Sequence, residues 1–168
     1  MARCAGIARQ RRHRYFRIAD PDVAQLLESL MGVAFGTGAV RTRSSPREPA
    51  LRKARVCYDH LAGELGVLVY DSLARRGAFA LDAGGVALTD TGRALVATLG
   101  IDPLPDATRR PLCRTCLDWS ERRHHLAGAL GTALLERFQQ LGWAHRVPGS
   151  RVLAFSGGGE AALRAWLT

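Results

Sequence analysis

Cysteine and histidine side chains offer the most direct route to chemistry in this sequence. Cys113 and Cys116 form a C-x-x-C pair, and two thiolates at that spacing can share one tetrahedral metal ion. Such an ion needs two further ligands, and the available ones are Cys57, His60, His124 and His125. One hypothesis is therefore a metal site that consists of Cys113, Cys116, Cys57 and His60.

The same cysteines have a second explanation as small, buried packing residues. Cys57 and Cys116 occupy equivalent places in a duplicated segment, so the duplication alone accounts for both. A catalytic role is not indicated. The pairs Asp59–His60 and Cys116–His125 have neither a third orienting group nor an oxyanion hole that the sequence identifies. We therefore predict no enzyme activity.

The duplicated segment is the feature around which the chain is organised. It reads CYDHLAGELG from Cys57 to Gly66. It returns from Cys116 to Gly131 as CLDW, six extra residues (SERRHH) and LAGALG. The residues that follow the two segments also align. Two copies of one supersecondary unit are therefore predicted.

Each copy is predicted to contain a helix, a β-hairpin and a second helix. In the first copy, apolar residues four apart mark a helix that ends at Gly77, a hairpin turns at 82–85, and Thr89 caps the next helix. The residues before Cys57 are expected to be helical too. The second copy predicts the same order, with Ser156 as the cap. The expected core is Leu61, Leu65, Val69, Leu73, Leu88, Leu95, Leu126, Leu130, Leu134, Phe138, Leu163 and Trp166.

The first third of the chain has a different character. Residues 11–18 combine arginines with aromatic and β-branched side chains, which predicts a basic strand. Asp20 and Pro21 suit the cap and first turn of a helix, and a linker rich in glycine, serine and proline follows it. The basic strand fits either a contact to a nucleic-acid backbone or an edge strand that its arginines keep soluble.

The charge distribution favours a polyanionic partner. The formal net charge of the 168-residue chain is +9, and residues 1–56 hold 12 Lys and Arg against 4 Asp and Glu. Such a field attracts nucleic acid, although a solvated arginine-rich tail has the same charge. No stretch approaches the roughly 20 apolar residues of a membrane span, and no apolar secretory segment opens the chain. The cysteines are therefore expected to be reduced thiols in the cytosol.

The run from Arg12 to Val23 (RHRYFRIADPDV) resembles the second wing strand and following helix of ArsR-type winged helix-turn-helix repressors. The segments around Cys57 and Cys116 resemble a branch of that family with an extended C-terminal region. The resemblance implies a cytoplasmic, homodimeric regulator of transcription that binds double-stranded DNA and needs no cofactor. It also implies that DNA is released when an effector binds, often a soft or borderline divalent metal ion such as cadmium or lead.

The resemblance also assigns roles along the first third of the chain. The DNA contacts that it implies are Arg11, Arg12, His13, Arg14 and Tyr15. Dimerisation is expected through the helix at 23–30. Family members have several helices before the wing, and this chain begins just ahead of it, so we expect an N-terminally truncated regulator. The alternative is a stand-alone ligand-binding or protein-interaction module without operator recognition.

The predicted fold class is α+β and mainly helical. A remnant of a winged helix-turn-helix domain (1–35) and a linker (36–50) are expected to precede the first helix–hairpin–helix repeat (51–105) and the second (106–168). A lone hairpin is only marginally stable. Each hairpin is therefore expected to pack on helices of its own copy or of the other copy.

Overall fold

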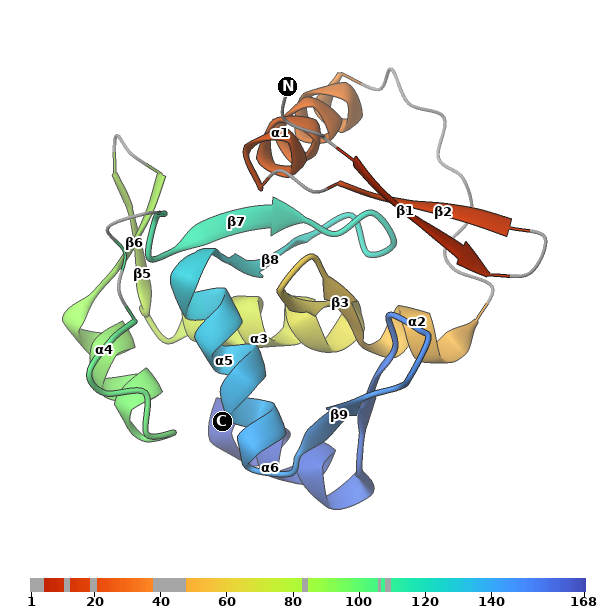
Figure 1. Cartoon of the computed structure of the whole chain (residues 1–168). Coiled ribbons are helices and arrows are strands. Elements are labelled where there is room, and N and C mark those ends of the chain that lie inside the picture. The colour runs from red at the N-terminus through yellow and green to blue at the C-terminus, as the bar shows by residue number, and fades with distance from the viewer. Residues whose placement is uncertain are drawn as a thin grey trace. The chain divides into compact units, whose positions relative to one another are not determined.

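The computed structural model describes residues 5–10, 13–18, 21–37, 48–82, 85–105, 107 and 110–168. The chain forms two compact units, residues 1–43 and 44–168, and the division falls within the predicted linker. Figure 1 shows the elements of both units along the chain. Within the described residues, no helix has the length and apolar character needed to cross a bilayer.

The N-terminal unit is an antiparallel hairpin followed by a helix. Strand β1 (Ala5–Gln10) pairs with β2 (His13–Ile18), and α1 (Pro21–Gly36) begins at the proline that the sequence places in its first turn. The strand and helix predicted here are confirmed, whereas β1 was not predicted. Helix α1 leaves large apolar side chains exposed, among them Leu26, Leu30 and Val33.

The C-terminal unit contains the two predicted copies, and each has the order hairpin, helix, hairpin, helix. The short helix α2 (Pro49–Lys53) precedes them. The first copy consists of β3 (Arg55–Cys57), β4 (His60–Ala62), α3 (Glu64–Arg75), β5 (Phe79–Asp82), β6 (Gly85–Leu88) and α4 (Asp90–Ala97). The second copy consists of β7 (Arg114–Leu117), β8 (His124–Ala127), α5 (Gly128–Gln140), β9 (Ala144–Arg146), β10 (Leu153–Phe155) and α6 (Gly157–Leu167).

The structure confirms the predicted α+β class and the predicted helix–hairpin–helix part of each copy. Thr89 and Ser156 cap α4 and α6 by accepting hydrogen bonds from Gly92 N–H and Gly159 N–H, each at 3.0 Å. Gly77 follows α3 with a φ of +73°, a left-handed conformation that glycine adopts without strain.

The leading hairpin of each copy is the feature that the periodicity did not predict. Leu61 belongs to the apolar stripe expected for a helix, but it lies in β4, and α3 begins only at Glu64. A strand that is followed directly by a helix can look like one long helix in the sequence, because both elements bury leucines and their apolar positions form one continuous pattern. The helix expected before Cys57 ends at Lys53, and residues 118–121 lie in the loop between β7 and β8.

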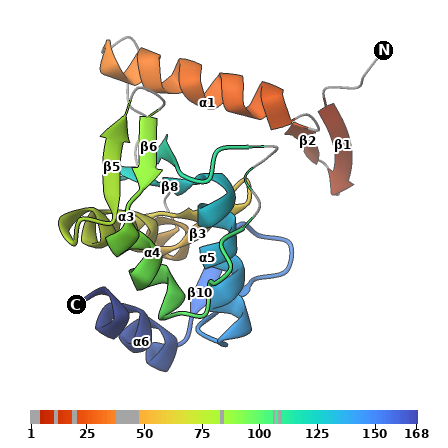
Figure 2. The same ribbon diagram turned by 90° about the vertical axis from the view of Figure 1, so that its left-hand side faces the viewer.

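The two copies exchange partners. Helix α3 of the first copy packs on β8 of the second, and α5 of the second copy packs on β4 of the first. Strand β3 also joins β10 of the other copy, where Val56 N–H donates to Arg151 O at 2.8 Å and Leu153 N–H donates to Ala54 O at 3.1 Å. The β5–β6 hairpin and α6 lie at opposite ends of this unit (Figure 2). Neither copy therefore has a complete core without the other.

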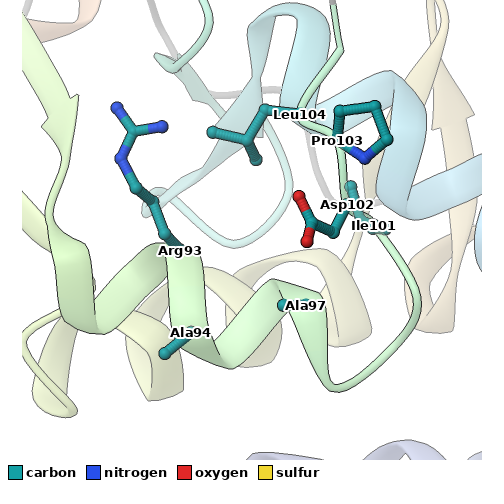
Figure 3. Close-up of a pocket in the computed structure, with 7 residues that line it drawn as sticks. All are labelled: Arg93, Ala94, Ala97, Ile101, Asp102, Pro103 and Leu104. Carbon is teal, nitrogen blue, oxygen red and sulfur yellow. The ribbon is translucent and has the colours of Figure 1, made fainter.

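The core lies between α3 and α5 and is the predicted one. Nine of the twelve expected residues are buried, and the other three (Leu88, Leu95 and Trp166) are partly buried against them. A separate hollow of about 330 Å³ lies beside α4 and the segment after it (Figure 3). Of the residues that the structure describes, two charged ones, Arg93 and Asp102, line this hollow. These two do not form the convergent set of polar groups that is typical of ligand sites.

A buried ion pair joins the two copies. The Arg55 guanidinium donates to Asp118 Oδ1 at 2.6 Å, and the two residues are 1% and 0% exposed. Gly63 N–H donates to the second oxygen of Asp118 at 2.7 Å, and Ser120 N–H donates to the first at 2.9 Å. Arg55 also stacks on Trp119, with its guanidinium carbon 4.9 Å from the ring centroid. The charges are thus paired and hydrogen-bonded, as burial requires.

Removing the cation should destabilise the fold strongly. We expect Arg55→Ala to lower the free energy of unfolding by about 3–5 kcal/mol, because Asp118 would stay buried without its partner. The control is Arg164→Ala, whose exposed pair with Glu160 within α6 should contribute about 0.3–0.5 kcal/mol. Urea unfolding followed by circular dichroism measures both, and equal losses would contradict a special role for the buried pair.

Candidate metal centre

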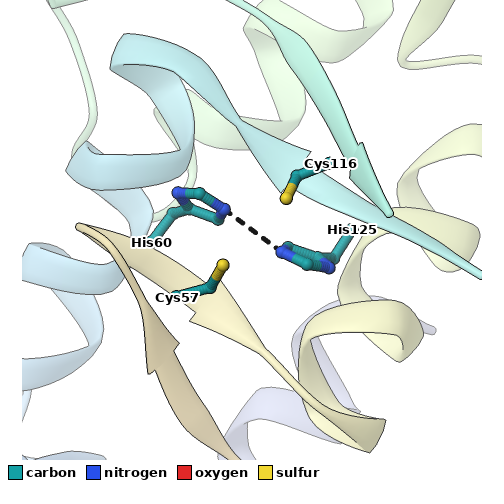
Figure 4. A group of neighbouring side chains, drawn as sticks. All are labelled: Cys57, His60, Cys116 and His125. Carbon is teal, nitrogen blue, oxygen red and sulfur yellow. Dashed lines mark hydrogen bonds between the residues drawn. The ribbon is translucent and has the colours of Figure 1, made fainter. Parts of the chain in front are cut away.

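Four side chains from the two leading hairpins meet at one point. The ligand atoms of Cys57, His60, Cys116 and His125 all lie within 4.8 Å of one another (Figure 4). We refer to these residues as the four-ligand cluster. In each hairpin, the cysteine of the first strand lies directly opposite the histidine of the second, since Cys57 pairs with His60 and Cys116 with His125. Each copy therefore contributes one sulfur and one imidazole.

Strand register shows which histidine of the second copy is equivalent to His60. The first hairpin turns through two residues, Tyr58 and Asp59, and Tyr58 adopts a φ of +59°. The six extra residues of the second copy lengthen that turn, and the register brings His125 opposite Cys116. The linear alignment of the sequences had placed Trp119 at the position of His60. Pairing of the strands, and not sequence order, thus identifies His125 as the fourth member.

Three of the four residues of the predicted metal site come together, and Cys113 is not among them. Cys113 is buried outside the four-ligand cluster, and burial raises the pKa of its thiol to about 11. His124 is exposed and points away from the core by the alternation of β8, whereas His125 is 1% exposed. The C-x-x-C segment suggested Cys113 as a ligand. Most of that segment lies within β7, where the two sulfurs need not face one site.

The four side chains point toward one another closely enough to share one ion. His60 Nε2 and His125 Nε2 are 3.1 Å apart and form a hydrogen bond (Figure 4). In a tetrahedral zinc site with sulfur and imidazole ligands, neighbouring ligand atoms are roughly 3.3–3.8 Å apart. The donor set therefore fits such an ion, and the ligand atoms, all within 4.8 Å of one another, lie close to the spacing that it needs.

A carboxylate stands behind each histidine. His60 Nδ1 lies 3.1 Å from Asp59 Oδ1, and Arg110 donates to the other oxygen of Asp59 at 2.5 Å. His125 Nδ1 lies 3.6 Å from Asp118 Oδ2 and, among the described residues, is a buried ring nitrogen without a hydrogen-bond partner. Carboxylates behind Nδ1 favour the tautomer that leaves Nε2 free to bind a metal. An arginine, an aspartate and a histidine follow one another in this way at both histidines, and in each case the arginine comes from the other copy.

Electrostatics in the cluster favour a thiolate at Cys57 and a protonated imidazole at His60, which must lose that proton to bind a metal. Hydrogen bonding with Cys116 lowers the pKa of Cys57 against the effect of burial, and the two histidines lower it further. Burial by itself would lower the pKa of His60, but Asp59 and Cys57 raise it to about 9. Burial likewise opposes ionisation of Asp59, yet His60 and Arg110 lower its pKa to about 2. A thiolate, the form that binds metals, is thus stabilised at Cys57.

The predicted DNA contacts belong to the other unit. Arg11 and Arg12 lie outside the described residues, and His13, Arg14 and Tyr15 begin β2. These residues and the four-ligand cluster lie in separate compact units.

The second glycine of each repeated LAGxLG motif lets a helix lie close to its own hairpin and beside the hairpin of the other copy. A Cβ at Gly131 would lie 2.6 Å from Leu126 O and 3.3 Å from His60 Cβ. A Cβ at Gly66 would lie 2.6 Å from Leu61 O and 3.6 Å from His125 Cβ. Helices α3 and α5 both need this close approach, because the hairpins beside them hold the four-ligand cluster.

Adding one methyl group at Gly131 should disturb the cluster. We expect Gly131→Ala to lower the free energy of unfolding by about 1–3 kcal/mol, because Leu126 or His60 must shift. Gly158→Ala is the control, since a Cβ there meets nothing within 4 Å and should change stability by less than about 1 kcal/mol. Thermal or urea unfolding measures both, and two equal effects would rule out the close approach.

Comparison with known proteins shows the family. No family model matches the chain, and no solved structure matches it significantly. Among curated proteins, the chain is similar to the uncharacterized HTH-type transcriptional regulator YdfF of Bacillus subtilis (strain 168), with 37% identity over 167 residues. Those residues cover 99% of this chain and 74% of YdfF. The chain therefore belongs to the family of HTH-type transcriptional regulators.

Proposed function

We propose that this chain is a DNA-binding transcriptional repressor of the ArsR type, and that its effector is a soft or borderline divalent metal ion such as cadmium or lead. The observation that carries the proposal is the four-ligand cluster, with two sulfur and two imidazole donors within 4.8 Å. Such donors favour soft and borderline ions, whereas magnesium and calcium prefer oxygen ligands. A bound ion would supply charge and a fixed geometry where the two copies meet.

The basic hairpin of the N-terminal unit is the proposed DNA contact. The five predicted contact residues lie in β2 or directly before it, and arginines on such a strand can bind phosphates along the duplex. The exposed apolar side chains of α1 suit a homodimer that pairs through this helix. In this proposal the protein is a cytoplasmic regulator and not an enzyme.

Burial of the cluster favours a second candidate function, a resident structural zinc ion. His60, Cys116 and His125 are at most 6% exposed, and the protein supplies four ligands. Closed sites of this kind are typical of zinc that stabilises a fold. The two candidates differ in the state without metal: a structural ion leaves an unfolded C-terminal unit when it is removed, and an effector leaves a folded one.

Metal binding should depend on His125 and not on Cys113. We expect the reduced protein to bind one cadmium or zinc ion per chain, with the ultraviolet absorption of a metal thiolate in the case of cadmium. His125→Gln or Cys116→Ser should weaken binding by more than the roughly 10–100-fold that follows loss of an outer-shell partner. Cys113→Ala is the matched control and should bind as the wild type does. Competition with a chromophoric chelator measures the affinities.

Two results would contradict the cluster as a metal centre. The first is an absence of thiolate absorption in the reduced wild type. The second is loss of binding in Cys113→Ala with binding retained in His125→Gln, which would favour the ligand set suggested by the C-x-x-C spacing.

Metal should also weaken the binding of DNA. We expect cadmium to lower the affinity of the full chain for a duplex from the adjacent promoter by about 5–150-fold, the usual range of allosteric coupling. Cys57→Ser should stay bound in the presence of cadmium, and Cys113→Ala should respond as the wild type does. Fluorescence anisotropy at fixed salt provides the measurement. Circular dichroism after chelation distinguishes the second candidate, because unfolding without metal would identify a structural ion.

A further inference from the structure

The two halves of the four-ligand cluster are built alike but are unequally exposed to solvent. We propose that Asp59 and Arg110 are positioning residues that hold His60 in place and determine how fast an ion leaves the cluster. The Cys57 and His60 half is then the one through which the ion exchanges with solvent. This inference rests on the proposed function, because it concerns the same cluster.

The half behind His125 is rigidly built. Asp118 is fully buried and accepts hydrogen bonds from Arg55, Gly63 N–H, Ser120 N–H and, at 3.1 Å, Glu121 N–H. Arg55 and Gly63 belong to the first copy, and the other two donors belong to the loop between β7 and β8 in the second copy. A carboxylate with so many partners does not move without breaking the core. His125 lies 3.6 Å from this carboxylate and is itself 1% exposed, so its burial leaves it little room to move.

The half behind His60 is open to solvent. Side chains of Asp59 and Arg110 are 29% and 38% exposed, whereas those of Asp118 and Arg55 are 0% and 2% exposed. Cys57 is half-buried, whereas Cys116 is 6% exposed. A ligand can leave an ion only if it has somewhere to go and water can replace it. On this side the half-buried Cys57 meets that condition, and the groups that hold the buried His60 are themselves partly exposed.

Arg110 anchors the open half to the opposite copy. Its guanidinium donates to Asp59 Oδ2 at 2.5 Å, to Gly128 O at 3.3 Å and to Thr132 Oγ1. The last two partners lie at the start of α5, so Arg110 joins the turn of the first copy to a helix of the second. Asp59 in turn faces His60 Nδ1 at 3.1 Å. Without Arg110, Asp59 loses its anchor and the imidazole loses the group that orients it.

The test compares the rate at which zinc is transferred from the loaded protein to an excess of chelator. We expect Arg110→Ala and Asp59→Ala to release zinc about 10–100-fold faster than the wild type, with an equal loss of affinity. The matched control is Arg123→Ala. Arg123 also pairs with an aspartate of the other copy, Asp71, but neither residue belongs to the cluster. It should release zinc at the wild-type rate.

A second readout separates positioning from general stability. Asp59→Asn keeps an oxygen that can accept from His60 Nδ1–H, so it should restore most of the slow release that Asp59→Ala loses. In nitrogen-15 NMR of the zinc-loaded protein, the Nδ1–H signal of His60 should broaden or shift in Arg110→Ala and remain in Arg123→Ala. Urea midpoints of the metal-free Arg110→Ala and Arg123→Ala proteins should be similar.

The outcomes distinguish this inference from the proposed function. If the wild type binds zinc and Arg110→Ala releases it no faster than Arg123→Ala, the positioning role is overturned and the metal centre stands. If Asp59→Asn behaves as Asp59→Ala does, the hydrogen bond to His60 is not the cause and the inference also falls. If the wild type binds neither zinc nor cadmium, the proposed effector fails and this inference fails with it.

Discussion

The carboxylate of Asp118 is the group on which the C-terminal unit depends. It is fully buried, and it accepts hydrogen bonds from the guanidinium of Arg55 and the backbone of Gly63 in the other copy. Burial raises its pKa, but Gly63, Ser120 and Arg55 outweigh that effect and lower the pKa to about 2. The group therefore stays charged, and each buried donor around it has an acceptor. An anion placed in this way binds the two copies together and lies behind His125 at the same time.

Duplication explains why a metal-sized cluster forms at the centre. A cysteine and a histidine that face each other across one short hairpin provide two ligands, which is too few for a closed site. Two such hairpins that meet provide four. Gly66 and Gly131 let each helix lie close to its own hairpin, and a Cβ at either position would also come within 4 Å of the other copy's histidine. The same exchange of partners that completes the core thus completes the cluster.

The proposed effector would have to bind one arrangement of the protein better than another. Ligands drawn equally from two copies would meet this requirement, since a movement of one copy against the other would separate sulfur and imidazole atoms that now lie within 4.8 Å. The two halves of the four-ligand cluster are also unequally buried, so solvent reaches one half more easily than the other. One half is fixed by Asp118 and Arg55, and the other, at Asp59 and Arg110, is reachable by water. Under the proposed function, this asymmetry would let an ion exchange through one half while the other half stays in place.

Sequence alone determined the features that arise from local chemistry. Caps at Thr89 and Ser156, the hairpin between β5 and β6, and the buried leucines of α3 and α5 follow from short-range propensity and apolar spacing, and the duplication is visible by alignment. Only the tertiary structure decided which cysteines and histidines share a site. Residues as close as Cys113 and Cys116 have different surroundings, whereas Cys57 and His125, 68 positions apart, meet because strand register and the crossing of the two copies place them together. Such long-range contacts depend on the packing of all elements at once, and no local pattern of residues records them.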